Sequence, residues 1–169
     1  MPAHVEVVRG DITTQQVDAV VNAANPAMRG GGGVDGAIHR VGGPQVLREC
    51  VQRFPDGLAT GTAGWTNAGD LPARHVIHVV GPDRRAGQSD PELLVSCYRE
   101  ALRVADELDA RTLAAPLVSA GVYGWPLDDA ARIAVGTVRA DLAAGDTSVT
   151  SAVFVAFGTE AYEALTAHL

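Results

Sequence analysis

The sequence predicts an α/β protein in which helices cover both faces of a central sheet. Short apolar runs alternate with longer segments, in which apolar residues recur every three or four positions. The chain has 169 residues, of which 47% are hydrophobic, so it can bury a core of ordinary size. We therefore expect one domain over residues 1–169.

The short apolar runs predict strands in chain order. A first strand is expected around Val5, Val7 and Val8, and a second at 18–22, which is too apolar for a half-exposed edge. Further strands are expected at 62–68, 74–80, 112–117 and 149–157. The strands with nearly continuous apolar sequence should be buried on both faces.

Helices are expected between these strands. Residues 34–41 and 44–53 form a pair, and Pro44 suits the first turn of the second helix. Further amphipathic helices are expected at 94–108, 126–142 and 160–168. Strands that alternate with helices bind ligands at their carboxyl ends. The connection 81–91 is expected to be a solvent-exposed loop and nothing more.

The charge balance limits the possible partners. All 13 basic residues are arginine, the acidic residues number 20, and the formal net charge is −7. A negative field of this kind repels nucleic acid and anionic membranes. An anionic ligand must therefore be held locally, by backbone amides and helix ends.

Cysteine and histidine spacing does not predict a metal centre. Cys50 and Cys97 do not form a closely spaced pair, so a disulfide framework or a zinc knuckle is not expected. His75 and His78 should point to opposite faces of one strand, which prevents joint chelation. We expect no metal and no cofactor.

The amino-terminal residues lack the charged start and apolar core of a signal peptide. No apolar run approaches the length of a membrane span. We therefore expect a soluble cytoplasmic protein that does not associate with membranes.

Two glycine-bearing segments follow apolar strands, residues 30–33 and residues 119–126. Glycine lets a backbone approach a ligand closely, and consecutive amides at a helix start can bind an anion. Either segment alone can be a simple tight turn. Because both would lie at strand ends, together they indicate a site for a diphosphate, with Asp35 beside it.

Two other nucleotide-binding motifs fit less well. The glycines at 31–36 match the spacing of a dinucleotide-binding turn, but Pro26 intervenes after the strand and Asp56 falls in a turn. A nicotinamide-dependent oxidoreductase is therefore a weak alternative. The triphosphate-binding P-loop is excluded, because it needs a lysine and the chain has none.

Several polar or aromatic residues near these segments have two readings. Asp35 can be a helix-dipole partner or an acid that acts on a water or a sugar hydroxyl. Asn25 can form a local turn or bind a ribose, whereas Asn22 is expected to satisfy loop backbone. Asp11 can support the turn at Thr13. For Phe157, a place in the core is the commoner outcome, and stacking on a base is the alternative.

Taken together, the motifs resemble one family. They are residues 10–13, 21–25, 30–39, 71–78 and 119–124, in order over nearly the whole chain. This set is similar to the macrodomain, specifically its MacroD-type branch. The resemblance implies a three-layer α/β/α fold with a central mixed sheet and a cleft for ADP-ribose.

The resemblance also implies residue roles. Asp11 would accept the adenine amino group beside Ile12, and Phe157 would lie near the ring. The glycines and the second loop would hold the diphosphate, while Asn25 and Asp35 would flank the distal ribose. The residues implied at the ligand are Asp11, Ile12, Asn25, Gly31, Gly32, Gly33, Val34, Ser119, Ala120, Gly121, Val122, Tyr123 and Phe157.

The activity implied by this branch is hydrolysis. Its members remove ADP-ribose from modified acidic side chains of proteins and deacetylate O-acetyl-ADP-ribose. Asp35 and Asn25 would then be the catalytic residues, and ADP-ribose and ADP-ribosylated proteins the partners. A non-catalytic reader of ADP-ribose is the alternative, since a cleft can bind without catalysing.

The chain departs from the family pattern at three places. Met28 and Arg29 replace a more usual leucine-containing lead-in to the glycines. Ala120 stands where a threonine is usual, and Trp125 where a phenylalanine is frequent. A larger ring at Trp125 is expected to narrow the ribose end and to bias the choice of substrate.

Overall fold

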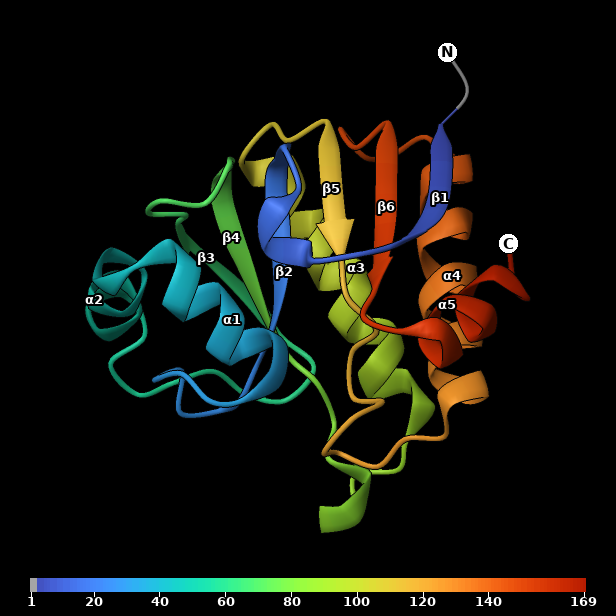
Figure 1. Ribbon diagram of the computed structural model, residues 1–169, viewed down its shortest axis with the longest axis horizontal. Helices are drawn as coiled ribbons and strands as arrows, with labels where there is room; N and C mark the ends of the chain where they lie inside the picture. The colour runs from blue at the N-terminus through green and yellow to red at the C-terminus, as the bar shows by residue number, and fades with distance from the viewer. Residues whose placement is uncertain (1–2) are drawn as a thin grey trace.

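The computed structural model describes residues 3–169 and has a six-stranded sheet with the order β1-β6-β5-β2-β4-β3 (Figure 1). The strands are β1 (His4–Arg9), β2 (Val17–Ala24), β3 (Ala63–Asn67), β4 (Ala73–Val80), β5 (Thr112–Ala115) and β6 (Ser151–Ala156). Only the β3–β4 pair among these is antiparallel. The mixed sheet is therefore confirmed.

Helices cover both faces of this sheet, which confirms the three-layer α/β/α arrangement (Figure 1). The α-helices are α1 (Gly33–Gly42), α2 (Pro44–Arg53), α3 (Pro91–Glu107), α4 (Leu127–Ala144) and α5 (Thr159–Thr166), and the 3-10 helices are η1 (Ile12–Thr14) and η2 (Arg84–Ala86). α1 and α2 pack on one face, and α3 and α4 pack on the other. Every strand and helix expected from the sequence is present, with small differences at the ends.

The larger core lies between the sheet and α3 and α4. Tyr98 of α3 packs edge-on against Phe154 of β6, and both are buried. The Tyr98 hydroxyl donates to the carbonyl of Pro116 at 3.0 Å and accepts from the amide of Val118 at 3.0 Å. Burial raises the pKa of Tyr98. This core contact fixes the start of the loop that follows β5.

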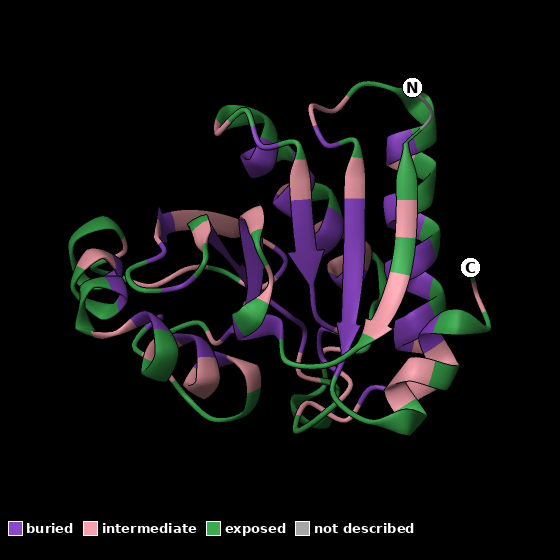
Figure 2. Cartoon of the chain, turned by 45° about the horizontal axis from the view of Figure 1, so that its top comes forward, coloured by how far each residue is buried: buried purple, intermediate pink, exposed green. Residues whose placement is uncertain are grey.

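The smaller core lies on the opposite face, under α1. Val20 of β2, Val76 of β4 and Ile38 of α1 are buried in it together. Purple strand interiors in Figure 2 show how completely the central strands are covered. Because their side chains alternate between the two faces, near-continuous apolar sequence is what these strands require.

Parallel strands place the following segments at one edge of the sheet. β1, β2, β4, β5 and β6 all run in the same direction, so their carboxyl ends meet at the lower edge in Figure 1. The β2–α1 loop (residues 25–32) and the β5–α4 loop (residues 116–126) both emerge there. The two glycine-bearing segments therefore follow neighbouring strands at the same edge.

Most of the connection 81–91 is exposed, as expected, but its first two residues are buried and the connection is bonded to the β5–α4 loop. Gly81 and Pro82 are buried, and the carbonyl of Pro82 accepts from Nε1 of Trp125 at 3.1 Å. The amide of Arg84 donates to the carbonyl of Tyr123 at 2.9 Å. Two hydrogen bonds therefore join this connection to the β5–α4 loop.

Trp125 is only 5% exposed and lies within the larger core. Its ring therefore packs beneath the β5–α4 loop, and its effect on the choice of substrate stays a prediction. Among the helices of residues 3–169, none combines the length and apolar character needed to cross a membrane.

Candidate functional site

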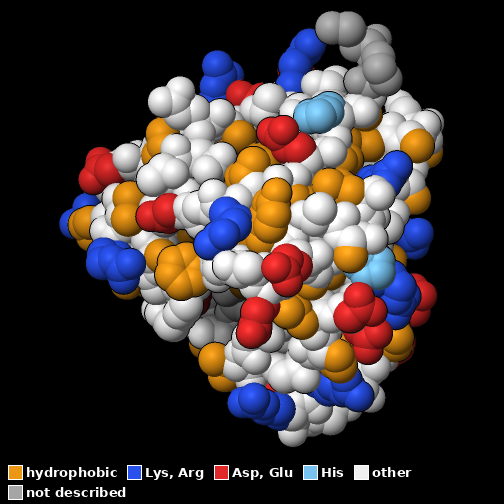
Figure 3. Space-filling model, turned by 45° about the vertical axis from the view of Figure 1, so that its right-hand side comes forward, with side chains coloured by type: hydrophobic (Ala, Val, Ile, Leu, Met, Phe, Trp, Pro, Cys, Tyr) orange, Lys and Arg blue, Asp and Glu red, His pale blue; other side chains and the backbone are white. Residues whose placement is uncertain are grey.

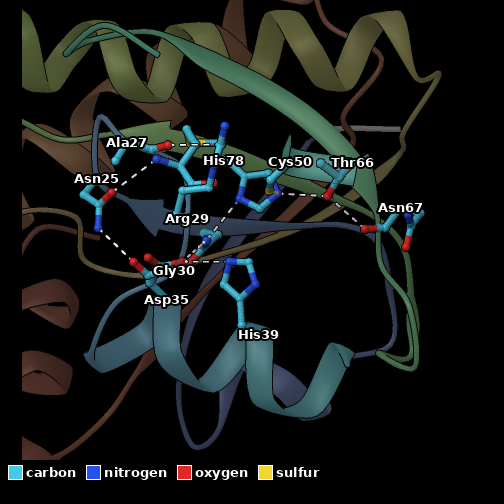
Figure 4. Close-up of polar contacts among 12 residues, drawn as sticks. Asn25, Ala27, Arg29, Gly30, Asp35, His39, Cys50, Thr66, Asn67 and His78 are labelled. Atoms are coloured by element: carbon cyan, nitrogen blue, oxygen red, sulfur yellow. Dashed lines mark hydrogen bonds and ion pairs between the residues drawn. The ribbon is translucent and has the colours of Figure 1, made fainter. Parts of the chain in front are cut away.

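The β2–α1 loop is held firmly against the carboxyl end of α2. Met28 has a φ of 59° and is buried beside Cys50 and Val80. The guanidinium of Arg29 donates to the carbonyls of Ala27, Met28, Phe54 and Pro55 at 3.1–3.2 Å. Figure 4 shows the bond to Ala27. This bonding fixes the loop before any ligand arrives.

The backbone amides of residues 31–35 donate to no other group among the described residues. α1 begins after Gly32 with no side-chain cap, and Gly33 has a φ of +57° that favours glycine. A Cβ at Gly36 would lie 2.6 Å from the Gly31 carbonyl oxygen, so the loop folds tightly onto the first turn. Free amides at a helix start, with the positive end of its dipole, form an anion site.

The β5–α4 loop presents a second run of free amides. The amide of Trp125 donates to the carbonyl of Ser119, and that of Gly124 donates to Gly121, both at 3.1 Å. Within the described chain, the amides of residues 119–123 have no acceptor. The loop is thus closed by its own backbone, with its remaining donors available.

Ser119 carries backbone strain in this loop. Its φ is +68°, and its buried hydroxyl has no hydrogen-bond partner among the described residues. A Cβ at Gly81 would lie 2.3 Å from that hydroxyl, so glycine is needed where the two segments meet. Strain of this kind is typical of sites where a backbone is arranged for a ligand.

Asp35 lies in the first turn of α1 and is only 4% exposed. Its Oδ1 accepts from Nδ2 of Asn22 at 2.8 Å and lies 3.3 Å from Nε2 of His39, one turn along the helix (Figure 4). Its Oδ2 is 3.1 Å from the position that a Cβ at Gly31 would occupy. The carboxylate therefore faces the glycine loop.

Asn25 is on the other side of Gly31. Its Nδ2 donates to the carbonyl of Gly30 at 3.1 Å, and its Oδ1 accepts from the amide of Met28 at 3.3 Å (Figure 4). Asn25 thus shapes the turn, and one N–H of its amide remains available. Its Nδ2 is 3.2 Å from the Cβ position at Gly31, so Asn25 and Asp35 both border that residue.

Two buried residues beneath Asp35, Asn22 and His78, extend this site, although their sequence positions did not predict it. Asn22 was expected to satisfy loop backbone, and that expectation is wrong. Its Nδ2 donates to Asp35 and, at 3.1 Å, to Nδ1 of His78. Its Oδ1 is buried without a partner among the described residues, which costs about 1–3 kcal/mol. Desolvation lowers the pKa of His78 to about 3, so its imidazole is neutral.

The predicted adenine end lies after β1 and β6. Oδ1 of Asp11 accepts from the amide of Thr13 at 2.9 Å and from its hydroxyl at 2.6 Å, and these bonds lower the pKa of Asp11. Asp11 thus supports the turn of η1, while its Oδ2 accepts from no described group. Ile12 is buried, and Phe157 is 92% exposed, so the expectation that Phe157 completes the core is wrong.

The surface carries charges of both signs, and no extended basic patch is visible on the face in Figure 3, which is hollowed below its middle. Val122, in the β5–α4 loop, is 81% exposed.

Among residues 3–169, no cluster of three or more histidine, cysteine or acidic side chains can hold a metal ion.

Comparisons with known proteins agree with this geometry. The model of the family described as "Macro domain" matches residues 21–134. A macro domain-containing protein of Streptomyces coelicolor is 57% identical over 169 residues, with 98% of each chain covered. An O-acetyl-ADP-ribose deacetylase of an Enterobacter species is 52% identical over 141 residues, covering 82% of this chain and 78% of the relative.

Solved structures show the same fold. A Trypanosoma brucei macrodomain in complex with ADP-ribose matches with a TM-score of 0.89 and 43% identity. The match covers 96% of this chain and 67% of the trypanosomal one. The fold, the glycine loop before α1 and the matching relatives together show that this chain belongs to the macro domain family.

Proposed function

We propose that this protein binds ADP-ribose and hydrolyses ADP-ribosyl esters. Its substrates in this proposal are proteins that carry mono-ADP-ribose on acidic side chains, and also O-acetyl-ADP-ribose. One observation carries the proposal: free amides of residues 31–35 and 119–123 follow neighbouring parallel strands, beside a buried carboxylate.

The ligand fits the donors that the loops offer. A diphosphate needs many N–H donors, and two runs of backbone amides supply them without a basic side chain. This explains how a chain with a net charge of −7 can bind an anion. Asp11 and Phe157 are available for an adenine ring, and Asn25 has an amide N–H available for the distal ribose.

Catalysis is assigned to Asp35. A carboxylate beside a diphosphate is repelled by it, so its placement indicates a chemical role. In the proposed reaction Asp35, helped by a phosphate oxygen of the substrate, orients a water and accepts its proton as the water attacks at the distal ribose end. The ester bond to the distal ribose breaks: O-acetyl-ADP-ribose gives ADP-ribose and acetate, and a modified protein gives ADP-ribose and a free acidic side chain.

The Enterobacter relative, named an O-acetyl-ADP-ribose deacetylase, supports an ester substrate of this class. Removal of ADP-ribose from protein acids also cleaves an ester of the distal ribose, with a larger acyl group. Val122 and residues 31–33 are exposed, which is consistent with a larger acyl group in the substrate.

A non-catalytic reader of ADP-ribose is the rival function. Calorimetry with ADP-ribose tests binding, and release of ADP-ribose from an acceptor modified on aspartate or glutamate tests hydrolysis. We expect both binding and release. Binding without release from either substrate would make the protein a reader, and no binding would overturn the proposal altogether.

A further inference from the structure

A chain of buried side chains runs beneath the site from β3 to α1. Thr66 of β3, His78 of β4, Asn22 of β2 and Asp35 of α1 are each hydrogen-bonded to the next. All of them are buried, and Asn22 and His78 are register partners on adjacent strands. Thr66 and His78 are too deep to touch a ligand in the glycine loops.

The donors in this chain are fixed in one direction. The hydroxyl of Thr66 donates to the carbonyl of Asn67 at 2.9 Å, so it accepts from Nε2 of His78 at 2.9 Å (Figure 4). A neutral imidazole with its proton on Nε2 accepts at Nδ1. Nδ1 can therefore accept the hydrogen bond from Nδ2 of Asn22 at 3.1 Å.

This arrangement fixes which way the amide of Asn22 faces. Both hydrogens on Nδ2 are used, one by His78 and one by Asp35, while Oδ1 accepts no hydrogen bond from a described group. With the amide reversed, its oxygen would meet two acceptors, Nδ1 of His78 and Oδ1 of Asp35. His78 and Asp35 together thus fix the orientation in which Asn22 donates to the carboxylate.

We propose that His78, held by Thr66, is a positioning residue that aims Asp35 at the glycine loop through Asn22. The proposal rests on the hydrolase function proposed for Asp35. If His78 only fills space, any substitution that preserves packing will preserve turnover. If it positions Asp35, the acceptor at Nδ1 matters more than the volume.

Two substitutions separate volume from hydrogen bonding. His78→Phe keeps the bulk and removes the acceptor, whereas His78→Asn keeps an acceptor near the Nδ1 position and leaves a cavity. A purely structural role predicts that the asparagine variant is the worse enzyme, because it is the less well packed. A positioning role predicts the opposite order. His75→Phe, on the same strand but facing away from the site beside Trp65, is the matched control.

The kinetic test uses O-acetyl-ADP-ribose and a glutamate-linked ADP-ribosylated protein. We expect His78→Phe to lower kcat on the order of tenfold to a hundredfold, with KM and the Kd for ADP-ribose changed less than about threefold. His78→Asn should recover most of kcat, and His75→Phe should match wild type. The proposal would be overturned if His78→Phe kept the wild-type kcat, or if the kcat of His78→Asn were lower than that of His78→Phe.

A second readout does not depend on activity. Imidazole nitrogen shifts should show His78 neutral, with its proton on Nε2, between about pH 5 and pH 8. The side-chain amide of Asn22 should exchange slowly in wild type and His78→Asn, and faster in His78→Phe. A proton on Nδ1, or equal exchange in all three proteins, would overturn the proposal. If the wild type cleaves neither substrate, the proposed function fails, and the imidazole and exchange measurements decide this inference by themselves.

Discussion

Nδ2 of Asn22 donates to Oδ1 of Asp35 at 2.8 Å, which joins the interior of β2 to the first turn of α1. Both residues are buried, although Asp35 lies in the first turn of a helix that begins at the exposed Gly33. The contact explains how a carboxylate can be kept next to a loop built for an anion. The amide of Asn22 partly balances the charge of Asp35, so the carboxylate does not have to bind the free amides of residues 31–35.

Gly32→Glu should abolish tight binding of ADP-ribose while leaving the fold intact. A Cβ at Gly32 meets nothing within 4 Å and the φ of −92° suits any residue, so the substitution has room. The carboxylate would then repel the diphosphate. We expect a Kd about 100-fold higher by calorimetry, equivalent to about 2.7 kcal/mol. Gly32→Ala is the control and should bind within a few-fold of wild type, and equal affinity of Gly32→Glu would refute the assignment of this loop.

Gly121→Glu tests the β5–α4 loop in the same way. Gly121 also has open space around its Cβ position and lies among the free amides of residues 119–123. Binding of ADP-ribose should weaken about 10-fold or more, because a negative charge is placed beside the diphosphate. Gly121→Ala serves as its control. If only Gly32→Glu weakens binding, the ligand does not bridge the two loops.

Gly36→Ala should destabilise the protein, and Gly136→Ala should stabilise it. The added methyl at Gly36 would lie 2.6 Å from the Gly31 carbonyl, whereas at Gly136 of α4 it meets nothing within 4 Å. Crowding of a backbone oxygen costs about 1–3 kcal/mol, and alanine in an open helix position gains about 0.5–1 kcal/mol. Urea unfolding measures both changes. A stable Gly36→Ala variant with normal ADP-ribose affinity would show that the tight contact between loop and helix is dispensable.

The free energy of unfolding should fall as the pH is lowered from about 6.5 toward 5. His78 has an ordinary pKa near 6.5 when unfolded and about 3 when folded, so the unfolded chain takes up a proton that the folded one does not. The stability from this residue is complete above about pH 6.5 and decreases by up to about 1.4 kcal/mol per pH unit below it. Asp35, His39 and Cys50 are the titratable groups that face it.

The control for this pH dependence is His78→Phe. That variant should lose most of the slope between about pH 6.5 and pH 5, while His75→Phe should lose less, because His75 is only partly buried. Urea unfolding at the two pH values gives the slope for each protein. Identical slopes in wild type and His78→Phe would contradict the burial of a neutral His78.

The fold was predictable because each strand and helix carries its own apolar pattern. The parallel strands also made it possible to expect both glycine loops at one edge. The pairing of Asn22 with His78 was not predictable, because 56 residues separate them and the register of β2 on β4 brings them together. One signal was present: each is a polar residue inside an otherwise apolar strand.

The burial of Gly81 and Pro82, at the start of the 81–91 connection, was not predictable for a related reason. The packing of one loop beneath another depends on the contact between Trp125 and Pro82, and no periodicity reports such a contact. The exposure of Phe157 was misjudged because the last strand ends one residue before it, at Ala156. Local pattern therefore located the elements and the loops, while long-range contacts decided which side chains support them.

The most direct measurement is release of ADP-ribose from an aspartate- or glutamate-linked acceptor by the wild type and by Asp35→Ala, with the Kd for ADP-ribose measured on both. We predict release by the wild type, a kcat about 10²–10⁴-fold lower in Asp35→Ala, and similar affinities. Equal kcat in the two proteins would contradict the role of Asp35.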